Sequence, residues 1–172
     1  WDGGAVTQST ARSELASLLA GRVPIIVIET RDEDSAMRLV LETAAGPTAA
    51  RPLPVFGWTL TGGLLRRDQA MGHAQKHNAS PGDLLHWIRE VNQPGVYVLQ
   101  DFHPFLDDPV HVRLLKDIAL DFERVPRTVV LVSHRLTVPG ELSHLVARFE
   151  LAFPSEAERR EIVERVVAEV AD

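Results

Sequence analysis

Two groups of potential metal ligands are present in the sequence. The first gathers carboxylates and imidazoles within eleven residues, namely Asp101, His103, Asp107, Asp108 and His111. Such ligands can hold a divalent metal, but their spacing matches no known compact site, and Asp108 before Pro109 is typical of a helix cap. The second is His73 and His77, spaced like two zinc ligands on a helix. Glycine, asparagine and proline around this pair disfavour a helix, so we expect no metal site.

The sequence lacks the loop that binds the phosphates of a nucleotide. That loop needs glycine-rich backbone amides followed by Gly-Lys and a hydroxyl residue, and no Gly-Lys pair occurs; the two lysines are Lys76 and Lys116. Residues 29–34 follow the first apolar run with four carboxylates and no glycine, which disfavours phosphate at a helix N-terminus. Asp101 ends another apolar run, as a magnesium-binding aspartate would, but Phe102 stands where a general base is usual. The sequence therefore argues against ordinary ATP hydrolysis by this chain.

Nucleophilic catalysis and anion binding each have one weak candidate. Ser133 and His134 are neighbours, but adjacent residues of a strand point to opposite faces, and no Gly-x-Ser-x-Gly elbow is present. Arg66 and Arg67 bring two guanidinium groups together, which suits phosphate. We therefore name no catalytic residue, and keep the arginine pair as a candidate anion contact with a solvated basic loop as the alternative.

Apolar, β-branched runs alternate with amphipathic segments along the chain. The runs predict strands over 23–28, 54–59, 95–100, 128–132 and 149–153. Helices are predicted after Thr10, over 36–44, after Ser80, after Asp108, at 142–146 and over 158–170, with a loop over 60–79. This alternation implies right-handed parallel crossovers. We therefore predict a three-layer α/β domain built on a doubly wound parallel sheet of about five strands.

The residues that directly follow the strands are the candidate site, because ligands of such sheets bind at the carboxyl ends of the strands. They are Glu29, Thr30, Trp58, Thr59, Asp101, His103, Ser133 and His134. Together they predict a crevice for a ligand or a partner. Two alternatives stay open, since Trp58 also suits a buried core and Asp101 a turn.

Composition limits the classes of function. Of the 172 residues, 45% are hydrophobic and 24% charged, as in a soluble globular domain. The formal net charge of -6 disfavours bulk binding to nucleic acids or anionic membranes. The absence of cysteine excludes disulfides and fits a reducing compartment, for which we expect the cytoplasm. No transmembrane run or signal peptide is visible, and a start at Trp1 predicts a piece of a longer protein.

Several segments resemble, in the same order, those of one family. They are IVIETRDE (26–33), WTLTGG (58–63), VLQDFHPFLD (98–107), RLLKD (113–117), TVVLVS (128–133) and VPGEL (138–142). Over about residues 13–165 the chain resembles the N-terminal domain of AAA-type ATPases of the hypothetical chloroplast reading-frame 46 family. It departs from that family at Ser133-His134, where serine-proline is usual, and in the glycine- and arginine-rich stretch 62–73.

The resemblance implies a degenerate AAA- or RecA-like domain without a phosphate loop over residues 1–154. Residues 155–172 would form a closing helix, at the start of a lid or as the link to a following AAA module. The resemblance also implies ATP and Mg²⁺ for the full-length protein and no cofactor for this chain. Its partners would be the AAA module and a substrate or regulator protein, and an oligomer is compatible with this.

We therefore expect a non-catalytic domain that regulates an ATPase module or binds proteins for it. The alternative is a weak, atypical nucleotide-binding or metal-dependent hydrolase that uses the crevice at the strand ends, with Asp101 and His103 holding the metal.

Overall fold

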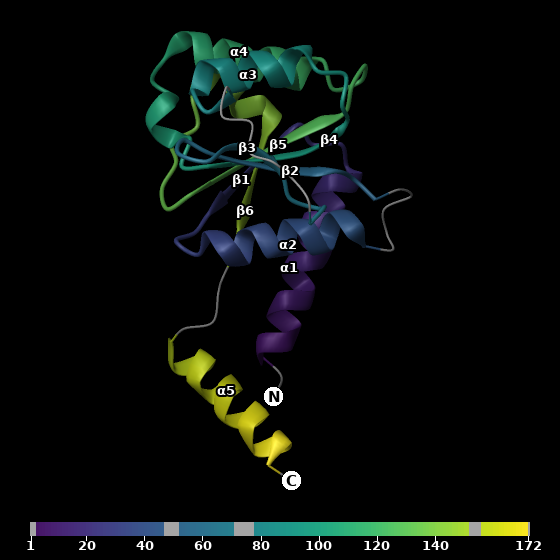
Figure 1. Ribbon diagram of the computed structural model, residues 1–172, viewed down its shortest axis with the longest axis vertical. Helices are drawn as coiled ribbons and strands as arrows, with labels where there is room; N and C mark the ends of the chain where they lie inside the picture. Colours follow the sequence, from purple (N-terminus) through teal and green to yellow (C-terminus); the bar gives the residue numbers. More distant parts are fainter. Residues whose placement is uncertain (1–2, 47–51, 71–77, 152–155, 172) are drawn as a thin grey trace.

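A sheet of six strands forms the centre of the computed structural model, which describes residues 3–46, 52–70, 78–151 and 156–171 (Figure 1). The strands are β1 (Ile25–Glu29), β2 (Val55–Thr59), β3 (Gly63–Arg66), β4 (Gly95–Gln100), β5 (Arg127–Ser133) and β6 (Val146–Glu150). Their order is β3-β2-β4-β5-β1-β6; β3 is antiparallel to β2, and the other pairs are parallel. The prediction of an α/β domain on a parallel sheet is confirmed, in an arrangement consistent with Rossmann- and RecA-like folds.

Helices cover both faces of the sheet. The helical segments are α1 (Gly3–Ala20), α2 (Glu33–Ala45), α3 (Pro81–Glu90), α4 (Pro109–Leu120), α5 (Glu156–Val170) and the short 3₁₀ segments η2 (His103–Phe105) and η3 (Gly140–Leu145). One face packs against α3 and α4, and the other against α1 and α2, whereas α5 lies outside these layers beyond α1 and α2 (Figure 1). No helix among the described residues combines the length and apolar character needed to cross a membrane.

Alternate residues of each central strand fill two separate cores. In β1, Ile25 and Val27 join the core under α3 and α4, whereas Ile26 and Ile28 join the core under α1 and α2. All four side chains are at most 1% exposed. Because successive side chains of a strand point to opposite faces, a strand covered on both faces must be apolar throughout. This explains the unbroken apolar run that predicted β1.

The starts of α3 and α4 follow from their caps. The Ser80 hydroxyl accepts a hydrogen bond from the Asp83 N–H at 3.3 Å, and a carboxylate oxygen of Asp108 accepts one from the Val110 N–H at 2.8 Å. Each cap is followed by proline at the first helical position, where no N–H is needed. Both predicted helix starts are confirmed, and Asp108 is occupied as a cap.

The strand register brings the carboxyl ends of the three central strands to one edge. Glu29 at the end of β1 lies opposite Ser133 at the end of β5, and Gln100 lies opposite Val132. Asp101, which follows β4, donates its backbone N–H to the Val132 carbonyl at 2.9 Å. The loops after β1, β4 and β5 therefore leave the sheet side by side.

The sheet differs from the prediction at its two outer strands. The predicted loop over 60–79 contains β3 at 63–66, because these residues pair with β2 and form an edge strand of the sheet, although glycine has low strand propensity. The last strand lies at 146–150 instead of 149–153, since its parallel pairing with β1 begins at Val146. Residues 71–77, 152 and 153 of these predictions lie outside the described residues.

Three helical predictions also need correction. The first helix starts at Gly3 rather than after Thr10, so Thr10 lies within the helix and is not its N-cap. The segment predicted as a short helix at 142–146 is the 3₁₀ segment η3. The last helix begins at Glu156, two residues earlier than predicted.

Candidate functional site

The turn from β1 into α2 carries carboxylates at the position where a phosphate-binding loop would follow the first strand. Asp32 is the N-cap of α2, and its two carboxylate oxygens accept hydrogen bonds from the Ser35 N–H at 3.1 Å and the Ser35 hydroxyl at 2.7 Å. The Arg159 guanidinium of α5 lies 3.0 Å from the same carboxylate. These contacts, those with Ser35 first, lower the pKa of Asp32. The helix N-terminus is thus already occupied by a negative charge of the chain itself.

Glu29 and Thr30 are also engaged within the chain. The Glu29 carboxylate pairs with the Arg148 guanidinium of β6, which also donates to the Leu136 carbonyl at 3.0 Å. The Thr30 hydroxyl accepts a hydrogen bond from the Asp32 N–H at 3.0 Å, and its own N–H donates to the Ser133 carbonyl at 2.8 Å. These two predicted site residues therefore hold the β1 turn against β5 and β6.

Asp101, His103 and His134 meet at the ends of β4 and β5. One potential ligand atom from each residue lies within 4.8 Å of the other two. The two imidazole rings stand at 85° to each other with centroids 5.1 Å apart. Asp101 and His134 are exposed, and His103 is half-buried. The structure thus brings together three residues of the predicted set that come from two different loops.

Two features of this cluster are unusual. Asp101 has a φ of 54°, a left-handed backbone conformation that aspartate tolerates better than most residues. The Nδ1 atom of His103 is buried and has no hydrogen-bond partner among the described residues. On the side of α2, burial raises the pKa of Glu33, and the nearby Asp101 carboxylate raises it further. The edge is therefore rich in groups that favour a cation over an anion.

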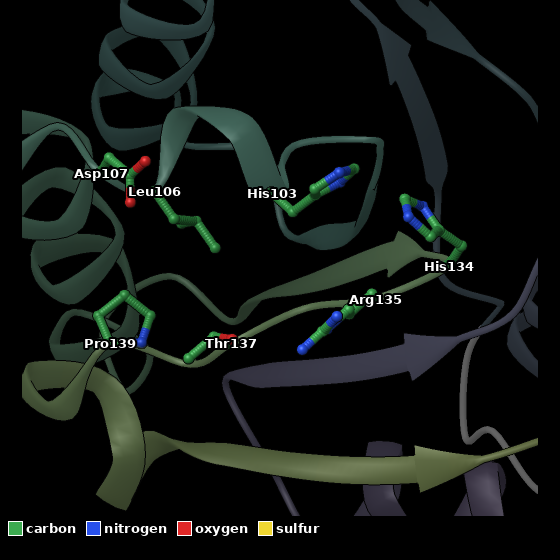
Figure 2. A pocket seen from close by; sticks show the side chains of 7 residues that line it. All are labelled: His103, Leu106, Asp107, His134, Arg135, Thr137 and Pro139. Carbon is green, nitrogen blue, oxygen red and sulfur yellow. The ribbon is translucent and has the colours of Figure 1, made fainter.

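A cavity of about 470 Å³ opens beside the two histidines (Figure 2). It is lined by His103, Leu106, Asp107, His134, Arg135, Thr137 and Pro139. In Figure 2 the rings of His103 and His134 lie at one end of the group, and Asp107 and Pro139 lie at the other. The cavity lies between the segments that follow β4 and β5, and of the eight predicted site residues His103 and His134 line it.

The three remaining residues of the predicted set support the edge from within. Trp58 is 1% exposed, and its indole N–H donates to the carbonyls of Asn78 and Ala79 at 3.0 and 3.1 Å. Ser133 is also 1% exposed, and its hydroxyl donates to the Arg135 carbonyl at 3.1 Å. The half-buried Thr59 accepts from the Gly62 N–H at 2.9 Å. Burial keeps Trp58 and Ser133 away from any partner at the surface.

The candidate anion contact lies on the edge strand β3, away from this crevice. Arg66 donates from Nε and Nη2 to both oxygens of Asp68, at 2.6 and 3.0 Å, and its guanidinium lies 5.5 Å from the centre of the Phe56 ring. Asp68 thereby raises the pKa of Arg66, while the arginine lowers the pKa of Asp68. Arg66 already has an anionic partner, whereas Arg67 is exposed.

The other potential ligands are separated from the cluster or lie elsewhere. His111 shares a hydrogen bond of 2.7 Å between its Nδ1 and the Phe105 carbonyl. His73 and His77 lie outside the described residues. Spacing along the chain does not group His134 with these ligands, because it lies 31 residues beyond His103. Only the pairing of β4 with β5 could have joined it to them.

A comparison with protein-family models identifies the chain. Residues 11–151 match the model of the SpoVK-like AAA ATPase, N-terminal domain. The chain belongs to this family. The match spans every strand of the SpoVK-like N-terminal domain described here, and it confirms the resemblance to an AAA ATPase N-terminal region.

Relatives of this SpoVK-like domain are ycf46 AAA domain-containing proteins. The identity is 26% over 153 residues with that of Pyropia yezoensis, covering 87% of this chain and 30% of the relative. For the relative from Trieres chinensis the identity is 25% over 154 residues, which cover 90% of this chain and 30% of the relative. For the relative from Guillardia theta it is 27% over 151 residues, which cover 87% of this chain and 29% of the relative. The chain therefore spans less than a third of the length of these relatives, which are longer AAA proteins.

Proposed function

We propose that this N-terminal domain neither binds nor hydrolyses ATP itself, and that it regulates, orders or recruits partners for the AAA module of a longer protein. The observation that carries the proposal is the occupied N-terminus of α2. There Asp32 caps the helix, Glu29 pairs with Arg148, and Glu33 adds a further carboxyl group. A phosphate at this position would meet negative charge instead of free backbone N–H groups.

For the hydrolase alternative, the described residues that line the crevice offer a triphosphate one arginine, Arg135, and no lysine. Lys116 lies in α4, and Lys76 lies outside the described residues. Near the β1 turn, Arg148 and Arg159 pair with Glu29 and Asp32, whereas Arg31 within the turn is exposed. In our proposal, ATP and Mg²⁺ are bound by the AAA module of the full-length protein, and the domain contributes through contacts between proteins.

The exposed face of α5 supports a protein contact. Val163, Val166, Val167 and Val170 are 53–81% exposed, and Ile162 is 39% exposed. Their spacing places them on one side of the helix, and an exposed apolar stripe of this kind marks an interaction site. We propose that residues 155–172 connect residues 1–154 to the AAA module and that this stripe packs on that module. The exposed strand-end residues, such as Asp101 and His134, form a second candidate contact for a substrate or regulator protein.

The compartment is inferred from the amino-acid composition. A chain without cysteine is suited to a reducing environment, for which we propose the cytoplasm.

Calorimetric titration of the chain with ATP and ADP, each with and without Mg²⁺, tests the first half of the proposal. We expect no heat of binding and no rise in melting temperature, because a ligand that binds the folded state must stabilise it. Micromolar binding, or Mg²⁺-dependent release of phosphate by this chain, would refute the claim and support the hydrolase.

Substitutions in α5 of the full-length protein test the second half. Val167→Glu places one negative charge in the stripe, whereas Ala168→Glu places the same charge on the opposite side of the helix. We expect Val167→Glu to change the ATPase rate or the assembly of the full-length protein and the control to leave both unchanged. Equal behaviour of the two variants would remove the stripe as a contact.

A further inference from the structure

We propose that Asp101, His103 and His134 form a binding site for a divalent transition-metal ion of the zinc type at the ends of β4 and β5. The proposal goes beyond the regulatory role suggested above and does not depend on it. It also replaces the expectation from sequence spacing that the chain has no metal site.

The donor set selects the class of metal. Two imidazoles and one carboxylate suit Zn²⁺, Fe²⁺, Co²⁺ or Ni²⁺, whereas Mg²⁺ prefers an all-oxygen environment. The same set of three protein ligands leaves at least one coordination position for water or another ligand. Such a position would lie near the cavity that His103 and His134 line (Figure 2).

The geometry is close to that of a bound ion. Potential ligand atoms of the three residues lie within 4.8 Å of one another, and metal bonds of about 2.0–2.2 Å require separations of roughly 3.3 Å. Rotation of the exposed side chains of Asp101 and His134 would close this difference, since both stand at the surface.

The buried Nδ1 of His103 provides an independent argument. A buried polar atom without a hydrogen-bond partner is rare and calls for an explanation, such as a bound ion. The two rings stand edge to face with their centroids 5.1 Å apart, and one potential ligand nitrogen of each lies within 4.8 Å of the other. An ion between the rings would satisfy a nitrogen of each.

The left-handed backbone of Asp101 adds a third observation. A φ of 54° is strained for most residues, and such strain is retained where the surrounding structure requires it. Here the Asp101 N–H bonds to the Val132 carbonyl while the residue turns from β4 toward η2. The turn sets Asp101 beside His103 and across from His134.

Metal titration of the 172-residue chain tests the site. Zn²⁺ would be titrated in competition with a chromogenic chelator, and Co²⁺ would be followed by its visible absorption. We expect one equivalent of either metal to bind, with a rise in melting temperature, and Mg²⁺ not to compete. Absence of binding, or binding of Mg²⁺ in preference to Zn²⁺, would overturn the proposal.

Four variants locate the bound metal. His134→Ala removes an exposed ligand, and Asp101→Asn keeps a residue that tolerates the left-handed backbone. We expect each to raise the Kd for Zn²⁺ by at least about tenfold. The controls are His144→Ala, on the exposed surface of η3, and the double variant His73→Ala/His77→Ala, and both should retain the wild-type Kd. Unchanged binding in His134→Ala, or its loss in either control, would place the metal elsewhere and refute the site.

Discussion

Replacement of Arg127 by methionine should destabilise the domain more than any surface substitution. This arginine begins β5 and is fully buried, with a relative exposure of 0%. Its Nη1 donates to the carbonyl of Ile88 and, at 2.8 Å, to that of Arg89 at the end of α3, and its Nη2 lies 2.8 Å from the Asp121 carboxylate. The side chain thus ties the last turn of one helix to a central strand.

The magnitude follows from what the substitution leaves behind. The last carbonyls of a helix receive no hydrogen bond from a following turn, so Arg127→Met removes the donor from three carbonyls, those of Ile88, Arg89 and, at 3.4 Å, Val91. A buried carbonyl left without a donor costs about 1–3 kcal/mol. Burial lowers the pKa of Arg127, so removing its charge recovers part of a desolvation cost. Asp121 keeps its pair with Arg124. We therefore expect a loss of about 3 kcal/mol in the free energy of unfolding.

Urea unfolding followed by tryptophan fluorescence measures this loss, with Arg124→Met as the control. Arg124 donates to the same Asp121 carboxylate at 2.9 Å but is exposed, and exposed ion pairs contribute little to the free energy of unfolding. If Arg127→Met cost no more than Arg124→Met, the inferred role of the buried guanidinium in holding α3 would be refuted.

Two further changes test the site edge by the same unfolding assay. Trp58→Phe should cost about 2 kcal/mol, because the ring is buried and its N–H serves two carbonyls; an unchanged stability would indicate that the indole is not needed inside the fold. Asp32→Asn keeps an N-cap residue but removes a carboxylate whose folded-state pKa is lowered by Ser35. That lowered pKa contributes stability above the unfolded value of about 4, and this contribution is lost as pH falls through the folded value. The difference between wild type and Asp32→Asn should therefore shrink from pH 7 to about pH 3, and a constant difference would contradict the assigned pKa shift.

The central strands could be predicted because a strand that is buried on both faces appears in the sequence as a continuous apolar run. The inner positions of β1, β4 and β5 are apolar, their polar residues stand at the strand ends, and both of their faces are covered by helices. The edge strand β3 could not be predicted in this way. Its Gly63-Leu-Leu-Arg66 sequence has little strand preference, and its conformation depends on hydrogen bonding to β2, a partner that local patterns do not reveal.

The candidate site was predictable as a location but not as a set of contacts. The rule that ligands bind at the carboxyl ends of parallel strands selected Asp101, His103, Ser133 and His134 together. Alternation along β5 then separates the last two, since Ser133 turns into the core and His134 outward. Linear spacing instead grouped Asp101 and His103 with His111, whose ring is held by the Phe105 carbonyl. Because two ligands come from one loop and the third from another, the strand order is needed before the chemistry of the cluster can be inferred.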